Sequence, residues 1–140
     1  MGCTAEFAGR DLGYINLLLQ MCNSTSRNAA TVLLGQVAVE TKSLQSLAEG
    51  CANLATLEGN CGLGNYDQGD GARFIGRGWL QITGRSHDAA ASAGIGAGLV
   101  DHPDAAADPA VSVAASAWYW NSRANALHVD KRSPIGHGAL

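Results

Sequence analysis

A glutamate set among apolar residues is the first feature of this sequence that suggests chemistry. Residues 28–48 have helical spacing, and at about 100° per residue Glu40 falls close to the same helical face as Leu33. A carboxylate on an apolar face is costly unless it is protonated or paired, and a carboxyl group that holds its proton can serve as a general acid. Gln36 lies one turn earlier, where it can hydrogen-bond Glu40. The helical pattern alone favours a general acid no more than a buried glutamate neutralised by an arginine.

An acid that acts on a glycosidic bond needs a second carboxylate, and two more glutamates follow Glu40. Glu49 comes nine residues later and Glu58 eighteen. Nine steps of about 100° put Glu49 half a turn out of phase, so it can face Glu40 only if the helix ends near Ala48 and the chain bends back. Gly50 favours such an ending. Inverting glycosidases hold the two carboxyl groups roughly 6.5–9.5 Å apart to admit a water. A solvated surface glutamate is the alternative for Glu49.

The elements that must position these residues are predicted to be mainly helical. Residues 58–78 contain seven glycines and predict a loop, and residues 74–83 are the best candidate for a strand or hairpin. Further helices are expected over residues 11–22, over 84–93 and from Asp108-Pro109 onward, because Asp is a favoured N-cap and Pro a favoured first residue. The inner face of this last helix is expected to hold Val111, Ala114, Ala115 and Trp118.

Length and composition indicate one globular domain over residues 1–140. Apolar residues make up 46% of the sequence and charged residues 15%, which suits a hydrophobic core. No apolar run is long enough to span a membrane, and no basic segment precedes residues 12–22, so neither a membrane span nor a signal peptide is expected. The net charge of −3 gives no reason to expect nucleic-acid binding. We expect a monomer.

The four cysteines, Cys3, Cys22, Cys51 and Cys61, do not have the spacing of a zinc site. Buried or free thiols are the favoured interpretation. A disulfide between Cys51 and Cys61, closing a surface loop, is the alternative.

Three segments together resemble the family 19 glycoside hydrolases, which include chitinases and phage endolysins. Residues 70–84 read Asp-Gly-Ala-Arg-Phe-Ile-Gly-Arg-Gly-Trp-Leu-Gln-Ile-Thr-Gly, similar to the family's Gly-Arg-Gly segment. Residues 36–41, Gln-Val-Ala-Val-Glu-Thr, are similar to the stretch that ends His-Glu-Ser or His-Glu-Thr. Asp108-Pro109 and the Ala-Trp-Tyr-Trp at 117–120 resemble a later helix of the family. The resemblance covers roughly residues 28–125 and implies a lysozyme-like α+β fold with a small hairpin or sheet.

The resemblance also implies roles for individual residues. Glu40 matches the family's general acid, and Glu49 lies near the position of the general base. Thr83 matches the hydroxyl that helps to hold the attacking water, and Gln81 matches a sugar-binding amide. His87 stands where members often have Asn, and it can hydrogen-bond a sugar.

Three further residues have two interpretations each. Arg77 is expected to pair with a carboxylate near the cleft or to have a purely structural role. Tyr66 and Trp79 are candidates for stacking on sugar faces, with a place in the core as the alternative. Two features depart from the family: Val39 replaces the usual His before the acid, and the tail from Ala124 lacks the family's closing Asn-Gly-Gly segment.

The resemblance implies an inverting glycosidase that needs no metal or organic cofactor. The predicted substrate is a β-1,4-linked N-acetylhexosamine polymer. We favour peptidoglycan as the substrate, with the protein acting as a bacteriophage endolysin. Such an enzyme passes from the host cytoplasm to the cell wall. Chitin, cleaved by a secreted enzyme, is the alternative. A non-catalytic glycan-binding relative and a single-acid lytic transglycosylase are further possibilities.

Overall fold

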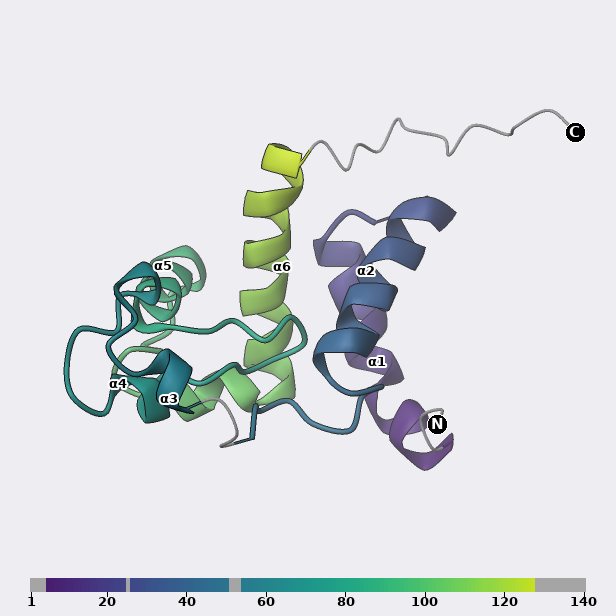
Figure 1. Cartoon of the computed structure of the whole chain (residues 1–140). Coiled ribbons are helices and arrows are strands. Elements are labelled where there is room, and N and C mark those ends of the chain that lie inside the picture. Colours follow the sequence, from purple (N-terminus) through teal and green to yellow (C-terminus); the bar gives the residue numbers. More distant parts are fainter. Residues whose placement is uncertain (1–4, 25, 51–53, 128–140) are drawn as a thin grey trace, which may run out of the picture.

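The computed structural model describes residues 5–24, 26–50 and 54–127, and in these ranges the chain is mainly helical, as predicted (Figure 1). The cysteines Cys3 and Cys51 and most of the atypical tail, residues 128–140, lie outside the described residues. The helical elements, in chain order, are α1 (Ala5–Met21), α2 (Arg27–Glu40), α3 (Leu54–Leu57), the 3-10 helix η2 (Cys61–Leu63), α4 (Asp70–Arg73), α5 (Arg85–Ile95), the 3-10 helix η3 (Pro103–Ala107) and α6 (Pro109–Leu127).

Helix α6 stands between the α1–α2 pair and the small helices α3–α5 (Figure 1). It packs against α1 on one side and against α5 and η3 on the other. The helix begins as the sequence predicts, because the Asp108 carboxylate accepts hydrogen bonds from the backbone N–H groups of Ala110 and Val111, at 3.0 and 3.3 Å.

The buried face of α6 differs in part from the predicted one. Of the four expected residues, Ala115 is buried, whereas Val111, Ala114 and Trp118 are half-buried. The other buried residues of α6 are Ser112, Val113, Ser116 and Ala117. Two of these are serines because the helix also receives the 74–84 segment. The hydroxyl oxygen of Ser112 accepts the N–H of Trp79 at 2.8 Å, and that of Ser116 accepts the N–H of Leu80 at 3.2 Å.

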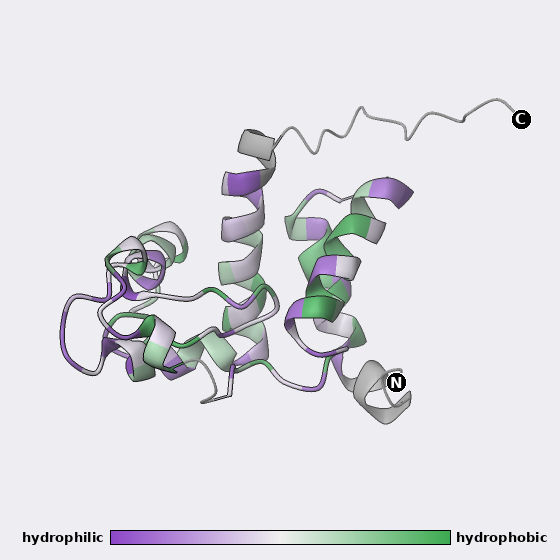
Figure 2. Ribbon diagram, viewed as in Figure 1, coloured by the Kyte–Doolittle hydropathy of each residue, from purple (hydrophilic) through white to green (hydrophobic). Residues whose placement is uncertain are grey.

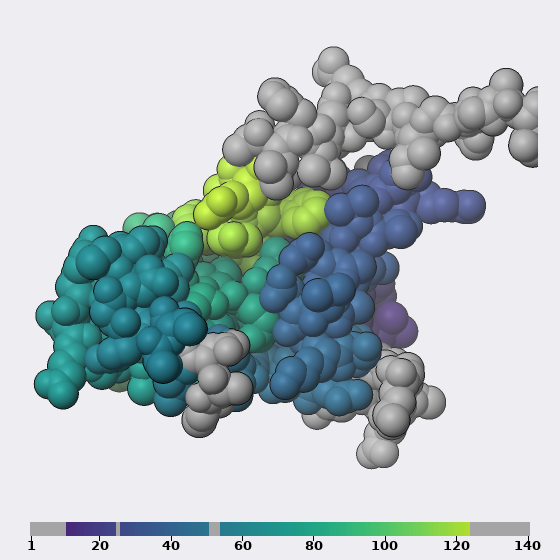
Figure 3. Space-filling view, in the orientation of Figure 1, coloured from purple at the N-terminus to yellow at the C-terminus, as the bar shows by residue number. Residues whose placement is uncertain are grey.

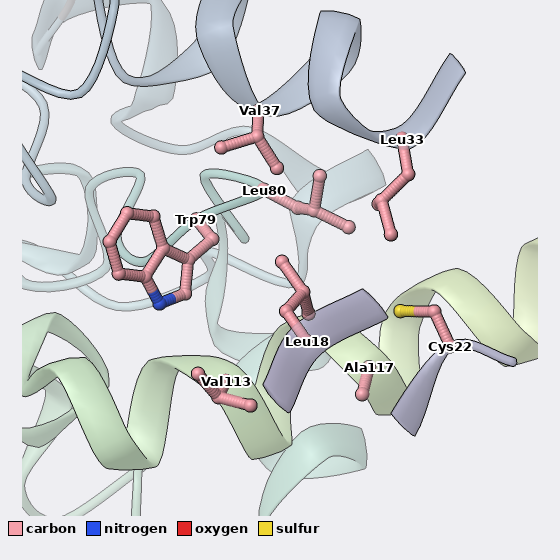
Figure 4. Packing of buried hydrophobic residues seen from close by; sticks show 8 residues of the cluster. All are labelled: Leu18, Cys22, Leu33, Val37, Trp79, Leu80, Val113 and Ala117. Carbon is pink, nitrogen blue, oxygen red and sulfur yellow. The ribbon is translucent and has the colours of Figure 1, made fainter. Parts of the chain in front are cut away.

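The main hydrophobic core joins segments that are far apart in the sequence (Figure 4). Its members come from α1, α2, the 74–84 segment and α6, and they are Leu18, Cys22, Leu33, Val37, Trp79, Leu80, Val113 and Ala117. The Trp79 side chain is fully buried, and its indole N–H points to the carbonyl of Pro109 at 3.4 Å. Trp79 is therefore a core residue, and the stacking role considered from the sequence is wrong. A second cluster, of Ile82, Ala91, Leu99, Ala106 and Ala115, lies between α5 and α6.

Helix α2 ends at Glu40, eight residues before the end that the sequence predicts. The Ser43 N–H donates to the carbonyl of Ala38 at 2.7 Å and the Lys42 N–H to that of Val39 at 3.4 Å, which is the Schellman pattern of a helix end. The Thr41 hydroxyl also stabilises the helix end. It donates a hydrogen bond to the Val37 carbonyl at 2.6 Å and accepts one from the Leu44 N–H at 2.9 Å. Helical periodicity alone did not show this ending because no glycine marks it.

The predicted hairpin over 74–83 forms with minimal pairing. Arg77 and Ile82 exchange backbone hydrogen bonds of 3.1 and 2.9 Å across a turn closed by Gln81 N–H to Gly78 carbonyl, at 3.2 Å. A third segment joins this pair through an antiparallel bridge between Ala48 and Arg77. The described residues contain these isolated bridges rather than extended strands, because glycines and turns interrupt the pairing on both sides.

The ribbons of α1 and α2 contain both hydrophobic and hydrophilic residues (Figure 2). Leu12, Leu17, Met21, Val32, Leu34 and Val39 are all exposed large hydrophobic residues of these helices. Among the described residues, no helix has the length and apolar character needed to cross a membrane.

Candidate functional site

Glu40 is the last residue of α2, and it lines a pocket at this end of the helix. Its carboxylate accepts a hydrogen bond from the Gln36 side-chain amide at 2.7 Å, which confirms the contact predicted from their spacing. The side chain is half-buried, and neighbouring Val39 is 76% exposed. The expected enclosure in an apolar face is therefore only partly realised, because the helix and its apolar face stop at this residue.

Glu49 returns to the same region after the turn that follows α2. Its backbone N–H donates to the Gly76 carbonyl at 2.7 Å, while the Gly78 N–H donates to the Leu47 carbonyl at 2.7 Å. The Gly76 N–H also donates to the Glu49 carboxylate at 3.1 Å. The second glutamate is thus held by the 74–84 hairpin and not by a continuation of α2.

Three polar side chains converge above Gly76. A methyl group at this glycine would lie 2.9 Å from the Thr83 hydroxyl, 3.0 Å from Gln81 Oε1 and 3.1 Å from Glu49 Oε2. Gln81 is fixed by a left-handed backbone with φ of 49° and by its side-chain amide, which donates to the Gly78 carbonyl at 3.0 Å. The Thr83 hydroxyl donates to the Gln81 carbonyl at 2.9 Å, so its oxygen can still accept a hydrogen bond. A side chain at position 76 would enter the space where these three groups meet.

The two glutamates line one pocket of about 240 Å³. The residues of its wall are Val39, Glu40, Lys42, Ser46, Ala48, Glu49, Gln81 and Thr83. In the space-filling view the blue surface of α2 and its following turn faces the teal surface of the small-helix side across a recess (Figure 3). Lys42, Ser46 and Ala48 were not recognised from the sequence, because their place on the wall depends on the turn after Glu40.

Arg77 stabilises the hairpin through contacts outside the described pocket wall. Its guanidinium is buried and donates to the Asp104 carboxylate at 2.7 Å, and to the carbonyls of Arg73 and Ile75 at 2.9 and 3.2 Å. Asp104 is almost fully exposed, and neither residue lines the pocket. Of the two roles considered for Arg77, these contacts support the structural one.

A buried carboxylate lies near Arg77 at the start of α5. Asp88 is 2% exposed, and burial raises the pKa of its carboxyl to about 7, although the positive charge of Arg77 acts in the opposite direction. Nothing in the sequence pattern singled out this residue, since an Asp in the first turn of a helix is usually a solvated one.

The remaining predicted substrate-binding residues do not line the pocket. The ring nitrogen Nδ1 of His87 lies 2.8 Å from the Thr83 carbonyl, and the ring stands edge-on to Tyr119 with centroids 6.1 Å apart. Tyr66 is 71% exposed on the loop before α4. Sugar binding by His87 and Tyr66 therefore stays a prediction, and contact with the glycan would have to occur beyond the pocket.

Glu58 has a different use from Glu49. Its carboxylate accepts the backbone N–H groups of Gly69 and Gly71, at 2.6 and 2.8 Å, which ties the end of α3 to the start of α4. This contact explains why the chain carries a glutamate there, and Glu58 is not part of the pocket wall.

The cysteine residues that the structure describes are free thiols. Cys22 is buried in the main core, where burial raises the pKa of its thiol to about 12, and Cys61 is exposed. The disulfide considered between Cys51 and Cys61 is thus not supported, because Cys61, the described member of the pair, is a free thiol. The described residues also contain no group of three or more His, Cys, Asp or Glu side chains that could hold a metal ion.

Comparison with known proteins points to one family. The family model for chitinase class I, glycoside hydrolase family 19, matches residues 25–133. The acidic endochitinase pcht28 of Solanum chilense is 35% identical over 101 residues, which cover 70% of this chain and 36% of that protein. A crystal structure of a chitinase C mutant has a TM-score of 0.63 and 22% identity, covering 86% of this chain and 66% of that one.

The structural match supports the lysozyme-like fold expected from the sequence. The chain spans only about a third of the length of the Solanum endochitinase, so that protein's activity is not transferred with the match. The matched segment includes the whole pocket wall and the hairpin that carries Thr83. Because the family model matches residues 25–133, most of the length of the chain, this chain belongs to glycoside hydrolase family 19.

Proposed function

We propose that this chain hydrolyses β-1,4-linked N-acetylhexosamine polymers, with Glu40 as general acid and Glu49 as general base. The observation that carries the proposal is that Glu40, Glu49 and Thr83 line one pocket. Glu40 ends α2, Glu49 follows the turn after α2, and Thr83 comes from the hairpin. A pair of carboxylates with room for a water is the arrangement that inverting glycosidases use.

Each residue has a distinct task in this mechanism. Glu40 protonates the leaving glycosidic oxygen, and the Gln36 amide at 2.7 Å holds its carboxyl group in place. Glu49 removes a proton from the attacking water, and the Gly76 N–H at 3.1 Å fixes the orientation of its carboxylate. The Thr83 oxygen accepts a hydrogen bond from the same water, which aligns it for attack on the anomeric carbon. The water enters opposite the leaving group, so the anomeric configuration inverts.

The family favours chitin as the substrate over the peptidoglycan that the sequence first suggested. The proteins that this chain resembles are named as chitinases, and none of these names mentions the bacterial cell wall. The Gln81 side-chain oxygen, directed over Gly76, is suited to accept a hydrogen bond from an N-acetyl N–H. Because both polymers contain β-1,4-linked N-acetylglucosamine, peptidoglycan is included as a second substrate in the experiment.

The experiment is hydrolysis of soluble chitin oligosaccharides, colloidal chitin and purified peptidoglycan by the wild type and by Glu40→Gln. Gln is nearly isosteric but cannot donate the proton, so turnover should fall by about 10²–10⁴-fold. Proton NMR of the first product should show the inverted anomer. Circular dichroism of the variant should match that of the wild type, which separates lost chemistry from lost fold.

Three results would redirect the proposal. Near-full activity of Glu40→Gln would exclude Glu40 as the acid. Anhydro ends on the product would indicate a lytic transglycosylase. Binding to a glycan without turnover by the wild type would favour a non-catalytic relative, an alternative consistent with Val39 in place of the usual His.

A further inference from the structure

Lys42 is the one basic residue that the described part of the chain places on the wall of the pocket with Glu40 and Glu49. It follows Glu40 by two residues and is exposed. Among the described residues of the wall, Glu40 and Glu49 carry the other charges, and the rest are neutral. Lys42 therefore belongs to the wall that a substrate meets when it reaches the two glutamates.

The backbone of Lys42 is in a conformation that favours glycine. Its φ is 51°, and Ser43 and Leu44 follow with φ of 60° and 66°. Side chains rarely adopt this left-handed region, and residues held there often serve a function. The Schellman turn needs one such residue after Thr41, and glycine would satisfy it with less strain. A lysine at this position is therefore not explained by the fold alone.

The charge of the pocket depends on Lys42 in the protonation state that catalysis needs. With Glu40 protonated and Glu49 ionised, the formal charges of the wall residues that the structure describes are 0 for Glu40, −1 for Glu49 and +1 for Lys42, a sum of zero. Without Lys42 the sum is −1. A neutral pocket suits a neutral N-acetylated sugar, whereas a negative pocket attracts the ammonium group of a deacetylated one.

We propose that Lys42 contributes to specificity in this cleft by disfavouring deacetylated, cationic sugar units and so favouring fully N-acetylated glycan. This proposal rests on the proposed function, because the protonation states follow from the acid and base roles. The repulsion is an electrostatic effect on a partly hydrated site, so salt should screen it.

The test compares binding of two chitin oligosaccharides of equal length, one fully acetylated and one partly deacetylated. Titration calorimetry is done in the Glu40→Gln background, where Gln reproduces the neutral form of the acid and prevents turnover. The pH is kept below about 6, where alkylamines are protonated. The measured quantity is the ratio of the two dissociation constants, with and without Lys42→Met.

Lys42→Met should shift this ratio on the order of fivefold toward the deacetylated oligosaccharide. This is the effect expected from removing one unit charge about 4 Å from the ammonium group of the sugar in water. Lys42→Gly should give the same shift with a relaxed turn, so misfolding of the Met variant cannot explain the result. Lys42→Arg should keep the wild-type ratio. At about 1 M salt, where the screening length is about 3 Å, the shift should largely disappear.

Arg27→Met is the matched control. Arg27 is exposed at the first residue of α2, roughly 20 Å from Glu40 along a helix that rises 1.5 Å per residue. Arg27→Met also removes one positive charge, at the far end of α2. The ratio of the two dissociation constants should therefore stay at the wild-type value. The proposal is overturned if the Met and Gly variants keep the wild-type ratio, or if Arg27→Met shifts it equally.

This outcome is separable from failure of the proposed function. If the wild type hydrolyses no glycan, the assignment of the acid and base fails. The binding ratio is still measured in that case, and an unchanged ratio on removal of Lys42 is what counts against the specificity role.

Discussion

Glu49 and Gly76 are joined by two hydrogen bonds, one from the glutamate N–H to the glycine carbonyl at 2.7 Å and one from the glycine N–H to the carboxylate at 3.1 Å. The backbone of one residue thus fixes both the position and the orientation of the other. This arrangement holds the proposed general base against the hairpin that also carries Thr83. Glu49 and Thr83 are therefore both held by the hairpin that contains Gly76.

Glu49→Gln should reduce hydrolysis by about 10²–10⁴-fold while glycan binding is retained, because the amide cannot accept a proton from water. The measurement is kcat on chitin oligosaccharides together with binding by calorimetry. Glu58→Gln is the matched control. It should leave kcat unchanged and lower the free energy of unfolding by about 1 kcal/mol, since the amide weakens the bonds from Gly69 and Gly71. Activity retained in Glu49→Gln and lost in Glu58→Gln would reassign the base.

Thr83→Ala should lower kcat roughly tenfold with little change in KM, because the lost hydrogen bond acts on the attacking water in the transition state. Thr83→Ser keeps the hydroxyl and should retain most of the activity. Steady-state kinetics on a defined chitin oligosaccharide provide both constants. A higher KM at unchanged kcat would instead identify Thr83 as a sugar contact.

Gly76→Ala should impair catalysis far more than stability. The added methyl group would come within about 3 Å of three side-chain oxygens, which can move aside but then leave their catalytic positions. A displacement of about 1 Å can lower the rate by about 10²-fold. Gly35→Ala is the control, because its methyl group meets open space on α2. It should raise stability by roughly 0.5–1 kcal/mol and leave kcat unchanged. Equal loss of activity in both variants would refute the steric argument.

The stability of the protein should fall as the pH rises towards and through 7, in part because of Asp88. Its folded pKa is about 7 and the value for an exposed Asp is 3.8, so the folded state binds the proton more tightly. The stabilisation is complete below about pH 4 and is lost as the pH rises through the folded pKa. Urea unfolding at pH 5 and at pH 8 should show the decrease.

Asp88→Asn should remove this part of the pH dependence. The amide stays neutral, so the variant should be more stable than the wild type at pH 8, by a few kcal/mol at most, and closer to it at pH 5. If the difference between the two proteins is the same at both pH values, Asp88 does not titrate in the range assigned to it.

Local sequence signals predicted the parts of this protein that depend on neighbouring residues. Asp108-Pro109 marked the start of α6, because an N-cap carboxylate and a proline at the first position act within a single turn. The spacing of Gln36 and Glu40 predicted their hydrogen bond for the same reason. The Gly-Arg-Gly segment, together with two other motifs, indicated the family, and with it Glu40, Thr83 and Gln81 as candidates.

The tertiary structure decided how these pieces meet. Helical periodicity placed Glu49 on the wrong side of α2, and the chain brings it back through a turn whose left-handed residues are Lys42, Ser43 and Leu44, not glycines. Pairing of residues 47–49 with 76–78 then sets Glu49 beside Thr83. Such pairing depends on contacts between residues almost thirty positions apart, which no local pattern encodes. The burial of Asp88 and the place of Lys42 on the pocket wall follow from the same long-range packing, so the sequence supplied the groups and the fold supplied their environment.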